Sequence, residues 1–362
     1  MTEELTLKGR SVFVTGGTGF IGARLVTGLV ELGANVTVLA RDRKGAREIG
    51  ALGVHTLTAG MDNEKQLLSA LEGTEIVFNL AYDVRATAVV NLANFDKLLR
   101  AAIQADVQRI VHVSSIVVYD DWPSRDLTEE SPVTPGYGSP YRRAKVEMER
   151  RLSEADIESA VIQPTLVYGP GSALWTDHLA DMLAGGTVVL PKPEGRCNAV
   201  FVDDVVQAMT RAAVTTNLTH DRFIISGASS CSWSDLLGGY AEIIGRGTVK
   251  QVARQEIEER LGPAPEETEN DDRQPLAARV SAMGRMVLGR KRFEALVARI
   301  KSAIAPNNHE FYPDHHLFGV YTSAGECRID HAREVLGYDP QFGMSEGLAA
   351  TRAHLTARFS EE

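Results

Sequence analysis

The sequence predicts an α/β protein with a doubly wound parallel sheet, followed by a smaller C-terminal lobe. Through about residue 165, short β-branched runs alternate with longer segments of helical periodicity, which is typical of βαβ units. The runs 76-IVFNL-80 and 110-IVHVS-114 are almost wholly apolar, as in central strands buried on both faces. The first strand leads through a glycine-rich turn into a helix. Right-handed crossovers between such units give a Rossmann-type sheet.

The elements follow one another in a regular order. The strands predicted for the sheet are Ser11–Thr15, Asn35–Ala40, His55–Thr58, Ile76–Leu80, Arg109–Ser114 and Ser159–Ile162. Apolar residues at helical spacing predict long helices over 86–105 and 141–155. After Pro164 the pattern loosens, with short strands near 199–202 and 222–226 and helices near Asp204–Val214 and Ser232–Ile244.

Composition narrows the classes of molecule that the chain is expected to bind. The 362 residues carry a formal net charge of -10, so the chain offers no general attraction to nucleic acid or to anionic lipid. The start MTEELTLKGR lacks the features of a signal peptide, and no apolar run is long enough to span a bilayer. We therefore expect a cytoplasmic protein with a small-molecule partner. Cys197, Cys231 and Cys327 have no disulfide or metal-site spacing, and we expect buried thiols and no bound metal.

The segment 11-SVFVTGGTGFIGARLVTGLVELG-33 predicts a dinucleotide site. It reads as strand, glycine turn and helix, an order that brings backbone N–H groups and a helix N-terminus to a pyrophosphate. Gly16, Gly19 and Gly22 form GxxGxxG, one residue longer than the simplest fingerprint. We expect Gly16 to make the tight turn, Gly19 to allow close phosphate approach, and Gly22 to let the helix pack on the strand.

The end of the second strand predicts NADP in preference to NAD. An acid there would bind the ribose hydroxyls of NAD, whereas arginine suits a 2′-phosphate. Here Arg41 follows the strand, with Arg43 and Lys44 close behind. Asp42 is the opposing residue, because it would serve a ribose hydroxyl if the strand ended later.

Four motifs in order resemble those of the extended short-chain dehydrogenase/reductases, a superfamily of NAD(P)-dependent epimerases, dehydratases, hydroxysteroid-dehydrogenase-like and flavonol-reductase-like enzymes. They are TGGTGFIG (15–22), VSSIVVY (113–119), SPYRRAK (139–145) and QPTLVYGPG (163–171). The resemblance covers roughly the first 245 residues, and 328–355 is similar to the usual C-terminal ending. It implies an enzyme with a substrate-binding C-terminal lobe, and a homodimer formed through the helices at 86–105 and 141–155.

Tyr141 and Lys145 stand four residues apart and so share one helix face. A free tyrosine titrates near pH 10, too weakly acidic to exchange protons readily near neutrality. A lysine ammonium about 4 Å away would favour tyrosinate by roughly 4 kcal/mol before desolvation is subtracted. We expect Tyr141 to act as general acid or base with a lowered pKa. The resemblance implies that Lys145 also binds the nicotinamide ribose.

The resemblance assigns further residues. Ser115, rather than its neighbour Ser114, would hydrogen-bond the reacting oxygen at the carboxyl edge of the sheet. Asn91 would steady cofactor or a relay water, although a packing role in its helix is nearly as good an interpretation. Asn79 would lie beside the cofactor, and Asp62 stands imperfectly where the family has an acid near adenine. The remaining expected cofactor contacts are Phe20, Ile21, Leu80, Ala81, Pro164 and Val167.

Departures from the family pattern narrow the choice of reaction. Ile116 and Val117 replace the acidic pair of the dehydratases, and Gln163 precedes Pro164 where nucleotide-sugar enzymes have arginine. Cys197 and Asn198 stand where those enzymes have an Arg-Asp pair, although Arg196 is one residue away. With the apolar 173-ALW-175, this favours ketone reduction or alcohol oxidation on an uncharged or hydrophobic substrate. Nucleotide-sugar 4-epimerisation is the alternative. A non-catalytic NADP-sensing protein is less favoured, because Tyr141 and Lys145 are both present.

We expect two domains. Residues 1–165 form the NAD(P)-binding Rossmann domain, to which about 198–226 return, and 166–362 form mainly the substrate-binding lobe. Within it, 262–320 is an unusual insertion or lid, with a solvated acidic loop at 262–275 and a basic solvated helix over 276–304. Adjacent His315 and His316 are poor joint ligands, and we expect a loop there.

Overall fold

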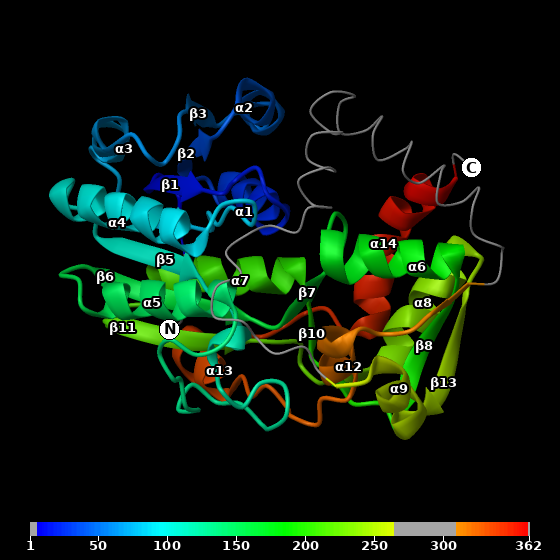
Figure 1. The fold of residues 1–362 in the computed structure, drawn as a ribbon. Helices are drawn as coiled ribbons and strands as arrows, with labels where there is room; N and C mark the ends of the chain where they lie inside the picture. The colour runs from blue at the N-terminus through cyan, green and yellow to red at the C-terminus, as the bar shows by residue number, and fades with distance from the viewer. Residues whose placement is uncertain (1–5, 264–308, 361–362) are drawn as a thin grey trace.

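The computed structural model describes residues 6–263 and 309–360, and a seven-stranded parallel sheet is its largest element (Figure 1). The strand order is β11-β6-β5-β4-β1-β2-β3. The strands are β1 (Ser11–Thr15), β2 (Asn35–Ala40), β3 (His55–Thr58), β4 (Ile76–Asn79), β5 (Arg109–Val113), β6 (Glu158–Pro164) and β11 (His220–Ile225). The predicted doubly wound sheet is therefore confirmed. β4 and β5 end one residue earlier than predicted, and β6 continues to Pro164.

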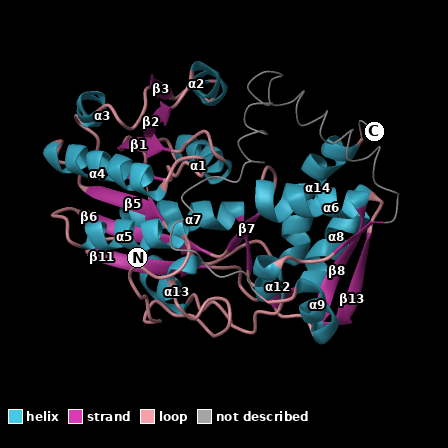
Figure 2. Cartoon of the chain, viewed as in Figure 1, coloured by secondary structure: helices cyan, strands magenta, loops and turns pink. Residues whose placement is uncertain are grey.

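Helices cover both faces of this sheet (Figure 2). On one face lie α1 (Phe20–Glu31) and α7 (Val202–Val214), and on the other α3 (Glu64–Leu71), α4 (Ala88–Gln104) and α5 (Pro140–Ser153). Within β1, Val12 and Val14 join the core under α1, whereas Phe13 joins the core under α4. Burial on both faces explains why the central strands are continuously apolar.

The order in which the chain adds strands to the sheet reverses at β1. From β1 the chain continues to β2 and β3 on one side, through α2 (Arg43–Gly50), and then returns to β4, β5 and β6 on the other. All these strands are parallel, so their carboxyl ends lie along one edge. The crevice between the carboxyl ends of β1 and β4 is where ligands bind in open sheets of this kind.

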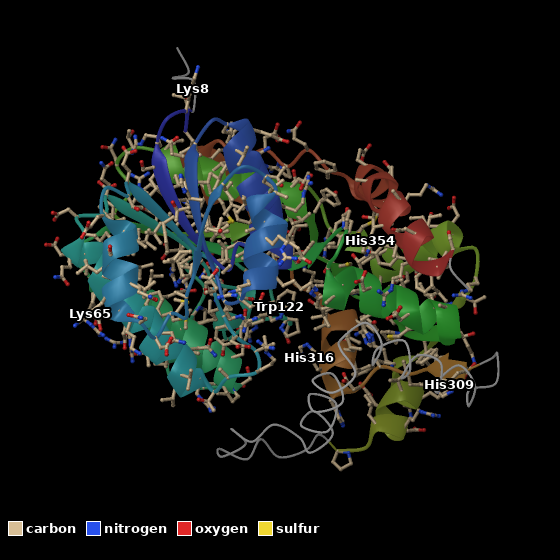
Figure 3. All side chains as sticks on the ribbon, turned by 90° about the horizontal axis from the view of Figure 1, so that it is seen from above. Lys8, Lys65, Trp122, His309, His316 and His354 are labelled. Atoms are coloured by element: carbon tan, nitrogen blue, oxygen red, sulfur yellow. The ribbon has the colours of Figure 1, made fainter. Side chains whose placement is uncertain are left out.

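A second lobe holds a three-stranded parallel sheet, β13-β8-β14 (Figures 1 and 2). Its strands are β8 (Gly186–Lys192), β13 (Thr248–Ala253) and β14 (His309–Phe311). Around it lie α6 (His178–Gly185), α8 (Trp233–Ile244), α9 (Arg254–Leu261), α12 (His315–Tyr321) and α14 (Met344–Phe359). Trp122 lies between the sheet domain and the lobe that carries His309 and His316 (Figure 3).

The remaining described elements are short. They are the 3-10 turn η1 (Ile116–Val118), β7 (Leu166–Tyr168), the π-helical turn η2 (Ala173–Asp177), β9 (Arg196–Cys197), β10 (Ala199–Phe201), β12 (Cys231–Ser232) and α13 (Asp330–Leu336). α7 and β11 pack into the Rossmann-type domain, and so does α13, which lies on β11 and α7.

Several expectations for the second lobe need correction. His315 and His316 open helix α12 rather than lying in a loop, because Asp314 caps that helix by accepting from Leu317 N at 2.8 Å. Cys197 and Cys327 are buried as expected, whereas Cys231 is only partly buried. The helix predicted over 276–304, and all but the first two residues of the acidic loop, lie outside the described residues. Over 6–263 and 309–360, every helix is too short or too polar to cross a membrane.

Candidate active site

The glycine turn after β1 has the shape of a phosphate cradle. Gly16 has a φ of +71°, and a Cβ added to it would lie 2.8 Å from the carbonyl carbon of Leu80. A Cβ on Gly22 would overlap the Gly16 carbonyl oxygen. Gly19 caps α1 without any side-chain hydrogen bond, so the first N–H groups of the helix stay open to an anion. These residues fit a dinucleotide pyrophosphate, with Phe20 and Ile21 in the first helical turn.

A buried hydrogen-bond network ties the carboxyl ends of β1, β4 and β5 together. Thr15 Oγ1 donates to Asn79 Oδ1 at 2.6 Å, and Asn79 Nδ2 lies 2.9 Å from His112 Nδ1. Ala81 N donates to Thr15 Oγ1 at 3.4 Å. Burial and the charge of Lys145 hold the pKa of His112 well below its ordinary value, so the imidazole is neutral. This network fixes the floor of the crevice, with Leu80 and Ala81 beside Gly16.

Tyr141, Lys145 and Ser115 come together at this edge, as predicted. The Ser139 side chain caps α5 by accepting from Arg142 N at 3.2 Å, and Pro140 suits the first helical position. The helix therefore starts where Tyr141 and Lys145 both face β5. Ser115 lies two residues beyond the end of β5 and hydrogen-bonds the Tyr141 side chain. Lys145 Nζ donates to Val113 O at 2.7 Å and lies 5.9 Å from the Tyr141 ring centroid.

The expected lowering of the Tyr141 pKa is wrong for the structure as it stands. Burial and the neighbouring Tyr82 raise the pKa of Tyr141 to about 12, and the hydrogen bond with Ser115 opposes this only in part. Lys145 is turned toward Val113 O rather than toward the tyrosine hydroxyl. Burial also lowers the pKa of Lys145 to about 8. Burial, whose extent the sequence does not reveal, is the largest cause of the pKa change in both groups.

Tyr82 is a site residue that the sequence reasoning missed. Its ring meets the Tyr141 ring edge to face, and it also lies 5.2 Å from Lys145 Nζ. Tyr82 stands three residues beyond β4, in the loop at the carboxyl edge of the sheet. That position is informative, but a tyrosine in a loop carries no signal by itself.

Glu149 is a second missed residue. It is buried one helical turn beyond Lys145, and its carboxylate accepts from the Ser114 hydroxyl and from Gln163 Nε2 at 3.0 Å. Gln163 Oε1 in turn accepts from Tyr119 Oη at 2.6 Å. Tyr141, Lys145 and Glu149 are spaced four residues apart and so share one helix face, which is the sequence signal that could have identified Glu149.

Two of the predicted cofactor residues, Arg41 and Asn91, both contact Asp83. β2 ends at Ala40 as predicted, and Arg41 Nη1 donates to Asp83 Oδ2 at 2.6 Å. Asp42 caps α2 by accepting from Gly45 N at 2.8 Å. Asn91 holds the Asp83 loop, since its Oδ1 accepts from Asp83 N at 2.8 Å and its Nδ2 donates to Asp83 O at 3.0 Å. Asn91 thus has a loop-holding contact, and its cofactor contact stays a prediction.

The other predicted cofactor residues occupy different parts of the edge. Asp62 is exposed in the turn before α3. Pro164 is the last residue of β6, and Val167 is buried in β7. Pro164 thus ends the strand next to β5 and Val167 follows that strand, on the Tyr141 side of the crevice.

The positions that depart from the nucleotide-sugar pattern are engaged elsewhere. Asn198 Nδ2 donates to Gly325 O at 2.9 Å, and Cys197 is fully buried. Arg196 donates to Ser230 Oγ at 3.1 Å and lies 3.7 Å from Glu326. In η2, Leu174 is 52% exposed, while Trp175 packs against Trp233.

Comparison with known proteins agrees with this geometry. Residues 12–225 match the model of the NAD dependent epimerase/dehydratase family. The chain is 27% identical to a 4-hydroxy-2-methyl-3-oxo-4-farnesyl-3,4-dihydroquinoline-1-oxide ketoreductase of Stigmatella aurantiaca, over 47% of this chain and only 54% of that protein. It is also 27% identical to a UDP-glucose 4-epimerase of Mycolicibacterium smegmatis, over 93% of this chain and 96% of that one.

A solved epimerase structure from Methanothermobacter thermautotrophicus shares the fold, with a TM-score of 0.70 at 17% identity over 98% of this chain and 94% of that one. The glycine cradle, the Tyr141 and Lys145 face and the family match lead to one conclusion: the chain is an enzyme and belongs to the NAD dependent epimerase/dehydratase family.

Proposed function

We propose that the chain is an NAD(P)-dependent oxidoreductase that interconverts a ketone and a secondary alcohol on a small uncharged or hydrophobic substrate. The observation that carries this is the meeting of Tyr141 with Ser115, and with Lys145 one turn away, at the switch crevice beside the glycine cradle. A bound nicotinamide would supply or accept the hydride. The chain itself orients the substrate oxygen and moves its proton.

The proton chemistry follows from the pKa values. With a pKa near 12, Tyr141 is protonated at neutral pH and can donate to the oxygen as a ketone is reduced. Ser115 holds the same oxygen by hydrogen bonding. Lys145, mostly protonated below its pKa of about 8, stabilises the tyrosinate that results. In the oxidation direction the same tyrosinate takes the proton back from the alcohol.

The uncharged substrate class is supported by the side chains around the crevice. Gln163 and Asn198 carry neutral amides, so neither position offers a cation to a diphosphate. Gln163 is buried and hydrogen-bonded to Glu149 and Tyr119, and Asn198 donates to Gly325 O. The half-exposed Leu174 adds apolar surface beyond β7. The ketoreductase similarity agrees with this class over the part of the chain that it spans.

Nucleotide-sugar 4-epimerisation is the second candidate. Two observations favour it: the UDP-glucose 4-epimerase aligns over nearly the whole chain, and Arg196 presents a half-exposed guanidinium one residue before Cys197. The same Tyr141 and Ser115 would then oxidise and re-reduce one carbon.

NADP is the proposed cofactor. Arg41 follows β2 directly, and its bond to Asp83 is an exposed ion pair of the kind worth about 0–1 kcal/mol. A 2′-phosphate therefore competes with Asp83 at little cost. Asp42 is engaged as the cap of α2, which supports the arginine over the acid as the deciding residue.

Substrate profiling tests the function. Purified protein is incubated with NADPH and a panel of apolar ketones, and separately with UDP-glucose and UDP-galactose. The proposal expects NADPH oxidation with at least one ketone and no interconversion of the UDP-sugars. Epimerisation without net cofactor turnover would establish the alternative. Cofactor binding with neither activity would support a non-catalytic binding protein.

A further inference from the structure

Glu149 lies in the protein interior beside the proton-transfer site. Helix α5 places it four residues after Lys145 on the same face, and both side chains are buried. A carboxylate buried for packing alone is poorly suited to that purpose, because apolar side chains of similar volume are often neutral or stabilising in its place. Its burial therefore calls for a specific electrostatic role.

The hydrogen bonds of Glu149 connect the three segments that build the site. Ser114 donates to it from the end of β5, next to Ser115. Gln163 donates from β6, directly before Pro164, at 3.0 and 3.1 Å to the two carboxylate oxygens. These are the donors expected of a carboxylate that is ionised, because they stabilise its charged form.

Charged groups of both signs lie around Glu149 and Lys145. The positive charges of Lys145 on the same helix and of Arg222 on β11 both act on Glu149. Arg222 also donates to Glu129 O and lies 5.8 Å from the Tyr119 ring centroid. Facing Lys145 are the neutral His112 on β5, the rings of Tyr82 and Tyr141, and the Val113 carbonyl. Among the described residues, Glu149 is the carboxylate that acts on Lys145.

The directions of the pKa changes agree with this arrangement. Burial lowers the pKa of Lys145, and the charge of Glu149 opposes that fall. Burial raises the pKa of Glu149, and Ser114, Gln163, Arg222 and Lys145 oppose that rise. Each group therefore helps the other to stay charged in the interior.

We propose that Glu149 is a positioning residue that keeps Lys145 protonated and, by holding Ser114, fixes the neighbouring Ser115 against Tyr141. The consequence for catalysis rests on the proposed function, because it assumes that Tyr141 exchanges the proton. The coupling between Glu149 and Lys145 does not depend on that function. It is a property of the folded chain with neither substrate nor cofactor added.

The direct test follows the titration of Lys145 by NMR of ¹³C-labelled lysine Cε atoms, with the signal assigned from a Lys145→Met variant. Glu149→Gln keeps the shape and one acceptor oxygen but removes the charge. Lys145 is expected to titrate at least about one pH unit lower in Glu149→Gln than in the wild type, a tenfold loss of proton affinity. Glu147→Gln is the matched control, since Glu147 is on the same helix but pairs outward with Arg150 and Arg151, and it leaves the titration unchanged.

A reciprocal measurement covers the case in which Glu149→Gln does not fold. In Lys145→Met, NMR of ¹³C-labelled glutamate Cδ atoms is expected to show the Glu149 pKa rising by a similar amount, because coupling between two sites is mutual. Unchanged titration of the partner group in either variant that folds would overturn the proposal. These experiments need no substrate, so they decide it even if the chain reduces no ketone.

Turnover gives a separate readout. Activity that needs protonated Lys145 is expected to fall off at lower pH in Glu149→Gln than in the wild type. Glu149→Asp retains the charge, so its activity should fall off at a higher pH than that of Glu149→Gln. Equal pH profiles in Glu149→Gln and the wild type would overturn the consequence for catalysis, whereas the two titrations decide the coupling itself.

Discussion

The ring of Tyr82 meets the ring of Tyr141 at an interplanar angle of 85°, with the ring centroids 4.9 Å apart. The Tyr82 side chain raises the pKa of Tyr141. Tyr82→Phe keeps the ring contact and removes the hydroxyl, so we expect the Tyr141 pKa to fall and alcohol oxidation to begin at lower pH. The pH profile of oxidation measures this. Tyr137→Phe is the control, because Tyr137 is 60% exposed. Identical profiles for Tyr82→Phe and the wild type would contradict the prediction.

Gly22→Ala tests the phosphate cradle. The added Cβ overlaps the Gly16 carbonyl oxygen, so the turn must move away from the helix. We expect at least about a tenfold loss of cofactor affinity by fluorescence titration, or a chain destabilised by more than about 1 kcal/mol. Gly238→Ala is the matched control, because a Cβ on that helical glycine meets nothing within 4 Å. Wild-type affinity and stability in Gly22→Ala would count against the cradle.

Arg41 and Asp83 test the choice of cofactor. Arg41→Ala removes the guanidinium proposed for the 2′-phosphate, so NADPH affinity should fall about tenfold or more while NADH affinity changes little. Asp83→Asn releases Arg41 from its counter-charge and should tighten NADPH binding several-fold. Arg47→Ala, at an exposed position on α2, is the control. Wild-type protein that binds NADH at least as tightly as NADPH would refute the preference.

Lys145 makes stability depend on pH. Its folded pKa of about 8 lies below the ordinary value of 10.5, so the unfolded chain binds the proton more tightly between these values. The penalty for charging Lys145 is therefore present in full below pH 8 and is relieved as the pH rises toward 10.5. Relative to Lys145→Met, the wild type should gain up to about 3 kcal/mol between pH 7 and 10 in urea unfolding. Lys44→Met, with an exposed ammonium, should show no such trend.

Local pattern was enough to predict most of the sheet domain. The β1 run SVFVT is buried on both faces and ends at glycines, so the strand and its turn can be located without knowing their neighbours. β13 is different, because TVKQVA is mostly exposed and becomes a strand only by pairing with β8, some sixty residues earlier in the chain. Helix α12 begins after the Asp314 cap, and the prediction overlooked this cap because it considered only the histidine pair that follows.

The residues of the site also divide into those that the local sequence predicts and those that only the fold brings together. Tyr141 and Lys145 were predicted because their spacing is local, and Ser115 because its motif, directly after a predicted strand, resembles that of the family. Tyr82 and Gln163 reach the site only through the order of the strands, and the rise in the Tyr141 pKa comes from burial by residues far apart in the chain. Distances within one helix were readable from the sequence, whereas desolvation was not.

The most direct test of the central claim is the turnover of Tyr141→Phe with NADPH and a ketone that the wild type reduces. The substitution removes the hydroxyl and leaves the ring against Tyr82. We predict a loss of about 10²- to 10⁴-fold in kcat, the usual contribution of general acid catalysis, with NADPH affinity changed by less than about threefold. Turnover that survives undiminished in Tyr141→Phe would contradict the assignment of Tyr141 as the proton donor.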